Sequence, residues 1–230
     1  MDETKYEGKI LTFYELIDES SIEVPIIQRD YAQGRIDKTE IRQNFLKALF
    51  DSLNSETPIK LDFIYGSKLN DSFQPLDGQQ RLTTLFLLHW YAASRTDNPE
   101  QNKNKLKKFT YETRITSREF CQELINNEIA INNEDDNLSS SIIDSNWFFL
   151  SWKKDPTIDS MLRTIDDIHI FFKEIGDLWE LLTSEKQLIS FYYVLLENIG
   201  LTDDLYIKMN ARGRLLTPFE NFKAGLQKEI

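Results

Sequence analysis

The feature that most constrains this chain is a polar cluster that runs directly into a long apolar stretch. Residues 82–93 would carry apolar side chains on nearly every face of a helix. In a globular protein such a stretch predicts a buried core helix. The five residues before it read Asp77-Gly78-Gln79-Gln80-Arg81. The fold must therefore bring an acid, two amides and a guanidinium to the entrance of a core helix.

The entrance of that helix is a natural place for an anion. The first backbone N–H groups of a helix lack internal partners and carry the positive end of the macrodipole. Gly78 permits close backbone approach or positive φ, and Arg81 offers a planar fork of donors to a phosphate. Asp77 suits a divalent cation or a water-orienting base. The same pattern supports a second interpretation equally well, in which Asp77 caps the helix and Arg81 pairs with a carboxylate.

Composition limits the classes of function. The 230 residues have room for one large domain or two modest ones, and the formal net charge is −11. That charge argues against a broad phosphate-binding surface and leaves room only for a local basic groove. The lone cysteine, Cys121, excludes an internal disulfide and a cysteine-based zinc site. The two histidines, His89 and His169, fall in apolar helical patterns, which argues against an HNH-type nuclease centre.

Periodicity in the first half of the chain predicts alternating helices and strands. A short helix is expected over 11–17, a strand over 22–27, and a longer helix after a capping box at 37–40, with Ile41, Phe45, Leu46, Leu49 and Leu53 on its apolar face. Strands over 61–65 and 73–76 should form a hairpin that turns at Asn70-Asp71. The first of these strands is expected to end at Gly66-Ser67, which either faces the same pocket as Gly78 or only terminates the strand.

The second half is expected to be mainly helical. Residues 95–108 are polar, and Asn98-Pro99 marks the best candidate boundary. Helices are predicted after a capping box at 116–119, after Asp155-Pro156, and over 178–182, with a loop over 131–141. The aromatic run at 147–152 is expected in the core, and 188–196 is assigned to a strand. A helix that starts at Thr217-Pro218 reaches Ile230 without a stop signal, so we expect the natural chain to continue.

Three motifs give the chain a resemblance to a known family. The run Asp77-Gly78-Gln79-Gln80-Arg81-Leu82-Thr83-Thr84 resembles the DGQQR motif of the GmrSD-type restriction-endonuclease N-terminal domain, whose fold is similar to ParB and sulfiredoxin. An upstream stretch, VPIIQRDY at 24–31, and a downstream stretch, LYIKMNARG at 205–213, match that family in the right order. The resemblance implies an α+β fold: a small mixed ParB/sulfiredoxin-like sheet with packed helices over 1–95, then a mostly helical lobe over 96–230 that returns to the core through 205–220.

The resemblance also implies a function and a set of site residues. It implies a nucleoside-triphosphate hydrolase with Mg²⁺ or another divalent cation, which regulates a nuclease located in another domain or partner. DNA would be engaged through the full-length protein or a partner. No membrane segment is visible, and a cytoplasmic protein is expected. The implied catalytic residues are Asp77, Arg81 and Gln80, with Asp77 at the metal, and the implied nucleotide-binding residues are Gln28, Arg29, Gly66, Ser67, Gly78, Gln79, Asn210 and Arg212.

Two other functions stay open at this point. The chain can instead be a DNA-recognition module that senses modified DNA without catalysis, through a local patch of Arg29, Arg35, Arg212 and Arg214. It can also be a phosphotransferase or a degenerate scaffold, because one fold supports several phosphate chemistries.

Overall fold

The structure is a computed structural model, and it describes residues 6–25, 30–112, 115–134 and 137–196. Contacts divide the chain into two compact units, residues 1–197 and 198–230. All the elements described below belong to the first unit. The predicted site residues Gln28, Arg29, Asn210 and Arg212 lie outside the described residues.

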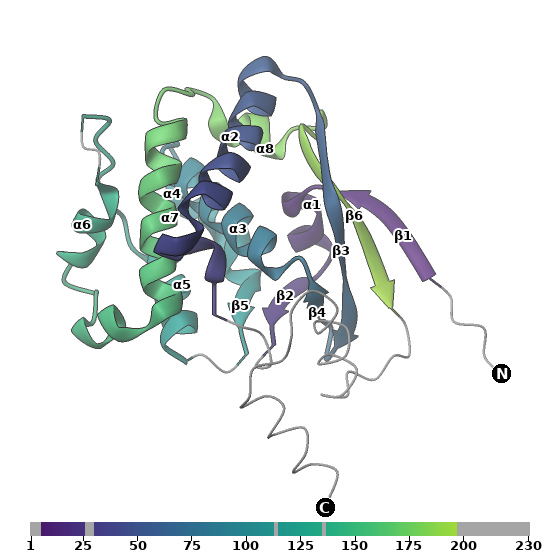
Figure 1. Ribbon diagram of the computed structural model, residues 1–230, viewed down its shortest axis with the longest axis horizontal. Helices are drawn as coiled ribbons and strands as arrows, with labels where there is room; N and C mark the ends of the chain where they lie inside the picture. The colour runs from purple at the N-terminus through teal and green to yellow at the C-terminus, as the bar shows by residue number, and fades with distance from the viewer. Residues whose placement is uncertain (1–5, 26–29, 113–114, 135–136, 197–230) are drawn as a thin grey trace, which may run out of the picture. The chain divides into compact units, whose positions relative to one another are not determined.

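Six strands of the described chain form one mixed sheet. They are β1 (Tyr6–Leu11), β2 (Ser21–Val24), β3 (Ile59–Leu69), β4 (Ser72–Asp77), β5 (Phe109–Tyr111) and β6 (Ile189–Leu196). Their order across the sheet is β1-β6-β3-β4-β2-β5 (Figure 1). The β1–β6 and β3–β4 pairs are antiparallel, and the β6–β3, β4–β2 and β2–β5 pairs are parallel. The predicted α+β class, with a mixed sheet and packed helices, is confirmed.

The helices connect and cover this sheet (Figure 1). They are α1 (Phe13–Glu19), α2 (Thr39–Ser55), α3 (Gln79–Ser94), α4 (Pro99–Asn104), α5 (Ile115–Asn126), α6 (Leu138–Ile143), α7 (Pro156–Phe172) and α8 (Leu178–Thr183). Short 3-10 helices occur at η1 (Ala32–Gly34), η2 (Ile36–Lys38), η3 (Lys105–Lys108) and η4 (Leu150–Lys154). Helix α7 packs against both α2 and α3. None of the described helices combines the length and apolar character needed to cross a membrane.

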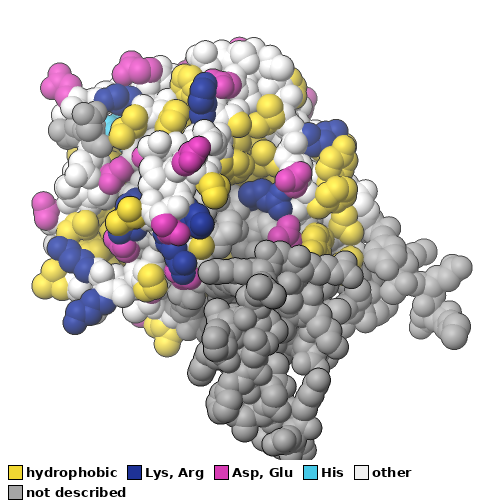
Figure 2. Space-filling view, in the orientation of Figure 1, with side chains coloured by type: hydrophobic (Ala, Val, Ile, Leu, Met, Phe, Trp, Pro, Cys, Tyr) yellow, Lys and Arg dark blue, Asp and Glu magenta, His cyan; other side chains and the backbone are white. Residues whose placement is uncertain are grey.

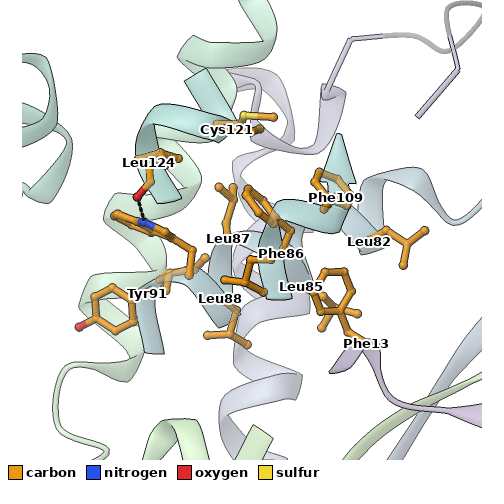
Figure 3. Close-up of a cluster of buried hydrophobic side chains, with 14 of the residues drawn as sticks. Phe13, Leu82, Leu85, Phe86, Leu87, Leu88, Tyr91, Phe109, Cys121 and Leu124 are labelled. Atoms are coloured by element: carbon orange, nitrogen blue, oxygen red, sulfur yellow. Dashed lines mark hydrogen bonds between the residues drawn. The ribbon is translucent and has the colours of Figure 1, made fainter. Parts of the chain in front are cut away.

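Helix α3 is the buried core helix that the sequence predicts. Its residues from Leu82 to Ala93 are all buried, and Figure 3 shows its side chains among those of neighbouring elements. Phe86 stacks on Phe109 of β5 with ring centroids 4.5 Å apart. The indole N–H of Trp90 donates to the carbonyl of Leu124 in α5 at 2.6 Å (Figure 3). Phe86 and Trp90, four residues apart on one face of α3, thus contact two different elements.

The hairpin that leads into α3 is confirmed, with one correction. Asn70 and Asp71 turn between β3 and β4 with φ of 48° and 63°. However, β3 does not end at Gly66-Ser67 but continues to Leu69. Gly66 pairs with Pro75, and a Cβ there would lie 2.1 Å from the Gln74 carbonyl oxygen. Gly66 therefore permits a close approach of two strands inside the hairpin, and it does not end the strand as the sequence predicted.

Several helix starts differ from the prediction. Helix α2 has Lys38 as its N-cap and no side-chain cap, because residues 36–38 form η2. Thr116 falls in the first turn of α5 and donates its hydroxyl to Asp155, so neither predicted capping box forms. Asp155 does cap α7 by accepting from the Thr157 N–H at 2.8 Å, with proline following it.

Other parts of the second half agree in type and differ in detail. The strand over 188–196 and the helix over 178–182 are confirmed as β6 and α8. Helix α6 lies within and beyond the predicted loop, and strand β1 has no counterpart in the prediction. In the aromatic run, Trp152 is buried but Phe149 is 59% exposed. The division near residue 95 stays a prediction, and both β5 and β6 from the second part lie in the common sheet.

Candidate functional site

The candidate site starts at a sharp corner between β4 and α3. Strand β4 ends at Asp77, Gly78 has φ of 92°, and α3 begins at Gln79. The carbonyl of Gly78 accepts the first helical bond from the Leu82 N–H at 2.8 Å. A Cβ on residue 78 would lie 2.7 Å from Cγ1 of Ile64. The positive φ and the contact with β3 both require glycine at this corner.

The N-terminus of α3 keeps the electrostatic character expected of an anion site. No side chain caps it, and its first turn contains no acidic residue. The macrodipole of this 16-residue helix places partial positive charge on the backbone at its start, and the nearby Asp77 and Asp62 carboxylates offset that charge. The backbone here can therefore bind an anion.

Arg81 lies one turn into α3 and is held by three oxygen partners. Its Nη2 donates to Oδ2 of Asp77 and to the carbonyl of Phe63, each at 2.8 Å. Its Nη1 lies 3.6 Å from Oδ2 of Asp62, whose side chain is 96% exposed. The pairing of Arg81 with a carboxylate, one of the two interpretations left open by the sequence, is the arrangement in the structure. Asp77 does not cap the helix.

The Asp77–Arg81 pair lies partly in solvent. The Asp77 side chain is 47% exposed and that of Arg81 is 19% exposed. Ion pairs of this type, four residues apart and in contact with water, contribute only about 0.3–0.5 kcal/mol. A ligand that supplies each group with a stronger partner can therefore separate them at small cost.

Gln79 uses its side chain to fasten the corner. Its amide nitrogen donates to the carbonyl oxygens of Pro75 and Leu76, at 3.0 and 2.5 Å. The side chain is buried, so it holds the end of β4 against the first turn of α3. Gln79, one of the nucleotide ligands predicted from the sequence, thus holds the corner in shape by bonding its side chain to backbone carbonyls of β4.

Gln80 connects the corner to a second polar segment. Its amide oxygen accepts from the Gln33 N–H at 2.9 Å, and its amide nitrogen donates to the Asp30 carbonyl at 3.2 Å. We call residues 30–35 the clamp loop. The clamp loop overlaps the upstream motif at Asp30 and Tyr31, so the structure brings these two motif residues to the first two turns of α3.

Tyr31 anchors the clamp loop in the interior. Its hydroxyl lies 2.6 Å from Oγ1 of Thr84 in α3, and Thr164 of α7 donates to it at 3.2 Å. Burial raises the pKa of Tyr31 to about 12, so the phenol stays protonated. One hydroxyl therefore joins α3, α7 and the loop.

A buried ion pair completes the same network. Nε of Arg42 in α2 donates to Oδ2 of Asp167 in α7 at 2.5 Å, and Nη1 of Arg42 donates to the Arg35 carbonyl at 3.1 Å. The pair was not predicted from the sequence, because Ile41 was expected on the apolar face of α2. Ile41 is 57% exposed. The signal was available, because Arg42 precedes the buried Leu46 and Leu49 by four and seven residues, which is helical spacing.

The other predicted site residues lie within the hairpin. Asp77 pairs with Tyr65 across the hairpin, so Gly66 and Ser67 follow directly along β3. Ser67 is buried and pairs with Gln74 in the register. Their assignment to nucleotide binding stays a prediction.

Groups remote from the corner behave as core residues. Burial lowers the pKa of His89 to about 4, and its Nδ1 lies 2.7 Å from the Leu85 carbonyl. Burial shifts the pKa of the Cys121 thiol in the other direction and raises it, so this thiol is not a reactive group. The described residues contain no cluster of three or more histidine, cysteine or acidic side chains that could hold a metal ion.

The fold and the site together define an α+β domain that presents an acid, glycine and arginine at the uncapped start of its core helix. The sequence model of one family, described as the GmrSD restriction endonuclease N-terminal domain, matches residues 11–227. The chain belongs to this family, which confirms the resemblance inferred from the motifs. No curated protein matches the chain.

Proposed function

We propose that this chain binds a nucleoside triphosphate with a divalent cation at the N-terminus of α3 and hydrolyses it. Its family is that of a restriction endonuclease, so the chain belongs to a restriction system that defends against phage. On this proposal, hydrolysis regulates a nuclease that lies in another domain or in a partner. DNA is then the target of the whole assembly.

The observation that carries the proposal is the combination of an uncapped helix start with Arg81 one turn further on. The N-cap is Gly78, and among the described residues no side-chain cap hydrogen bond forms at this helix start, so its first backbone N–H groups are available to a ligand. An oxyanion there would also be within one helical turn of the Arg81 guanidinium. Backbone donors and a guanidinium directed at the same anion are the usual means of stabilising phosphoryl transfer.

Two carboxylates near the corner support the proposed divalent cation. Mg²⁺ commonly takes one or two carboxylates and completes its shell with water and phosphate oxygens. Asp77 and Asp62 are the two carboxylates next to Arg81, and both are accessible. When bound, the metal would neutralise phosphate charge, and Asp77 would be its protein ligand. Arg81, released from Asp77, would then face the phosphate.

Phosphate release tests this proposal. We expect the chain with Mg²⁺ to release inorganic phosphate from ATP, GTP or both, and Arg81→Ala and Asp77→Asn to lower turnover at least about 100-fold. Lys47→Ala is the control, because Lys47 forms an exposed ion pair with Asp51, also four residues away, on α2. All variants should keep the thermal midpoint of the wild type within a few degrees.

The outcome that would refute the proposal is clear. Unchanged turnover in both corner variants, or no nucleotide turnover in the wild type, would remove the assignment. Comparing free phosphate with nucleotide consumed separates hydrolysis from transfer to an acceptor.

The structure gives less support to the DNA-recognition alternative. Arg35, one of the four arginines of its proposed patch, is bound to Asp30 through Nε at 2.9 Å and through Nη2 at 2.5 Å. The other three arginines lie outside the described residues. Where Figure 2 shows described residues, basic side chains are interspersed with acidic ones and form no broad basic surface. We therefore favour nucleotide hydrolysis.

A further inference from the structure

We propose that Arg42 is a positioning residue for the nucleotide site and acts on it through the clamp loop and Gln80. This inference rests on the proposed function, because it assigns a remote residue to the same site. Arg42 itself lies in α2 and is buried. Its effect would reach the phosphate only through the first turn of α3.

The guanidinium of Arg42 joins three segments that are distant in sequence. It donates to Asp167 of α7 through Nε at 2.5 Å, which fixes α2 against α7. Its Nη1 donates to the carbonyl oxygens of Arg35 and Gln33, at 3.1 and 3.4 Å. A planar guanidinium presents its donors in a fixed fork, so these bonds set where the clamp loop lies relative to both helices.

The clamp loop transfers this position to α3. Gln80 is bonded to the loop in both directions, by accepting from the Gln33 N–H and donating to the Asp30 carbonyl. The Gln33 backbone thus contacts Arg42 through its carbonyl and Gln80 through its N–H. Since Gln80 directly precedes Arg81, the direction of the first helical turn depends on this chain of bonds. Each polar atom of the Gln80 amide makes one bond to the loop, and in this proposal these two bonds give Gln80 a positioning role.

Stability alone gives a weak reason for a buried ion pair at this place. The side chains of Arg42 and Asp167 are only 4% and 13% exposed. Removing two charges from water is costly, and replacing such a pair with apolar residues of similar size is often neutral or stabilising. What an apolar pair cannot supply is the set of N–H donors to the loop carbonyls. The pair thus serves the geometry of the loop more than the stability of the core.

A role in stability and a role in positioning the loop can be separated by measuring the thermal midpoint and the nucleotide affinity of the same variants. In the double variant Arg42→Met/Asp167→Leu we expect the thermal midpoint to be kept or raised. The affinity for magnesium–ATP and magnesium–GTP should fall about tenfold, which corresponds to about 1.4 kcal/mol. Arg95→Met is the matched control, because Arg95 donates to the carbonyls of Phe172 and Lys173 at the opposite end of α3. It should lower the midpoint and leave the affinity unchanged.

Hydrogen exchange without nucleotide tests the positioning independently of the proposed function. Exchange of the Gln33 amide should be at least about tenfold faster in the double variant, and also in Gln80→Met, but not in Arg95→Met. Arg42→Lys keeps a cation beside Asp167 but loses the planar fork of donors to the loop carbonyls. It should show the same faster exchange, and it decides the question if the double variant does not fold. Unchanged exchange in a folded variant would overturn the inference. Loss of affinity that follows the midpoint in all variants, Arg95→Met included, would also overturn it. A wild type that binds neither nucleotide would refute the proposed function, and the exchange result would still decide the inference.

Discussion

Replacing Gly78 with alanine is the most direct test of how the β4–α3 corner is built. The residue has φ of 92°, and a Cβ would lie 2.7 Å from Cγ1 and 3.2 Å from Cβ of Ile64. Left-handed backbone costs an alanine about 1–2 kcal/mol, and an added methyl group in a packed site costs about 1–3 kcal/mol. We therefore expect Gly78→Ala to lower the free energy of unfolding by about 2–5 kcal/mol.

Urea denaturation followed by tryptophan fluorescence measures this loss. Gly8→Ala is the control, since no heavy atom lies within 4 Å of a Cβ built there, and its stability should stay the same or rise by up to about 1 kcal/mol. The double variant Gly78→Ala/Ile64→Ala should destabilise less than the sum of its single variants, because the steric part is relieved while the backbone part stays. A Gly78→Ala protein as stable as the wild type would refute this account of the corner.

Two further predictions concern the interior. The pKa of His89 in the folded protein is about 4, below its ordinary value of 6.5, so the unfolded chain binds the proton more readily. The free energy of unfolding therefore falls as pH drops from 6.5 towards 4. Between pH 7 and pH 5 this group contributes a loss of about 2 kcal/mol. Urea titrations of His89→Leu at both pH values should show this part of the loss removed, and an equal loss in variant and wild type would contradict the assignment. Tyr31→Phe removes the hydroxyl that lies between Thr84 and Thr164, so the free energy of unfolding should fall by about 1–3 kcal/mol. Tyr192→Phe, at an exposed position on β6, is the control. Equal stabilities of the two variants would refute the role of the Tyr31 hydroxyl.

The elements that the sequence predicted correctly are those whose signals are local. The core helix followed from apolar residues on all its faces, and the hairpin turn followed from Asn70-Asp71, which tolerate left-handed backbone. The start of α7 followed from an acid before Pro156, since both residue types suit a helix start. Such signals lie within a few residues of the element that they define.

What could not be predicted depends on contacts between distant segments. Ser52, which no motif singled out, is buried where its hydroxyl donates to the Thr57 and Leu188 carbonyls. The same holds at the candidate site. The sequence suggested that Gln80 belongs to a phosphate motif, but only the fold reveals that its amide is bonded to residues about 50 positions earlier. Local pattern likewise left both roles of Asp77 open, because the choice depends on where β3 places Phe63 and Asp62.

The charges at the corner lead to a condition on the proposed chemistry. Arg81 faces two carboxylates, Asp77 and Asp62, so these three side chains carry a net charge of about −1 at neutral pH. The helix start offsets only about half a charge of that. A free triphosphate would meet a corner that is close to neutral or negative, whereas a triphosphate with its metal brings a cation to the carboxylates and an anion to the guanidinium. On the proposed function, the metal and the nucleotide therefore bind as a unit. When the Asp77–Arg81 pair separates, the metal becomes the partner of Asp77 and the phosphate becomes the partner of Arg81.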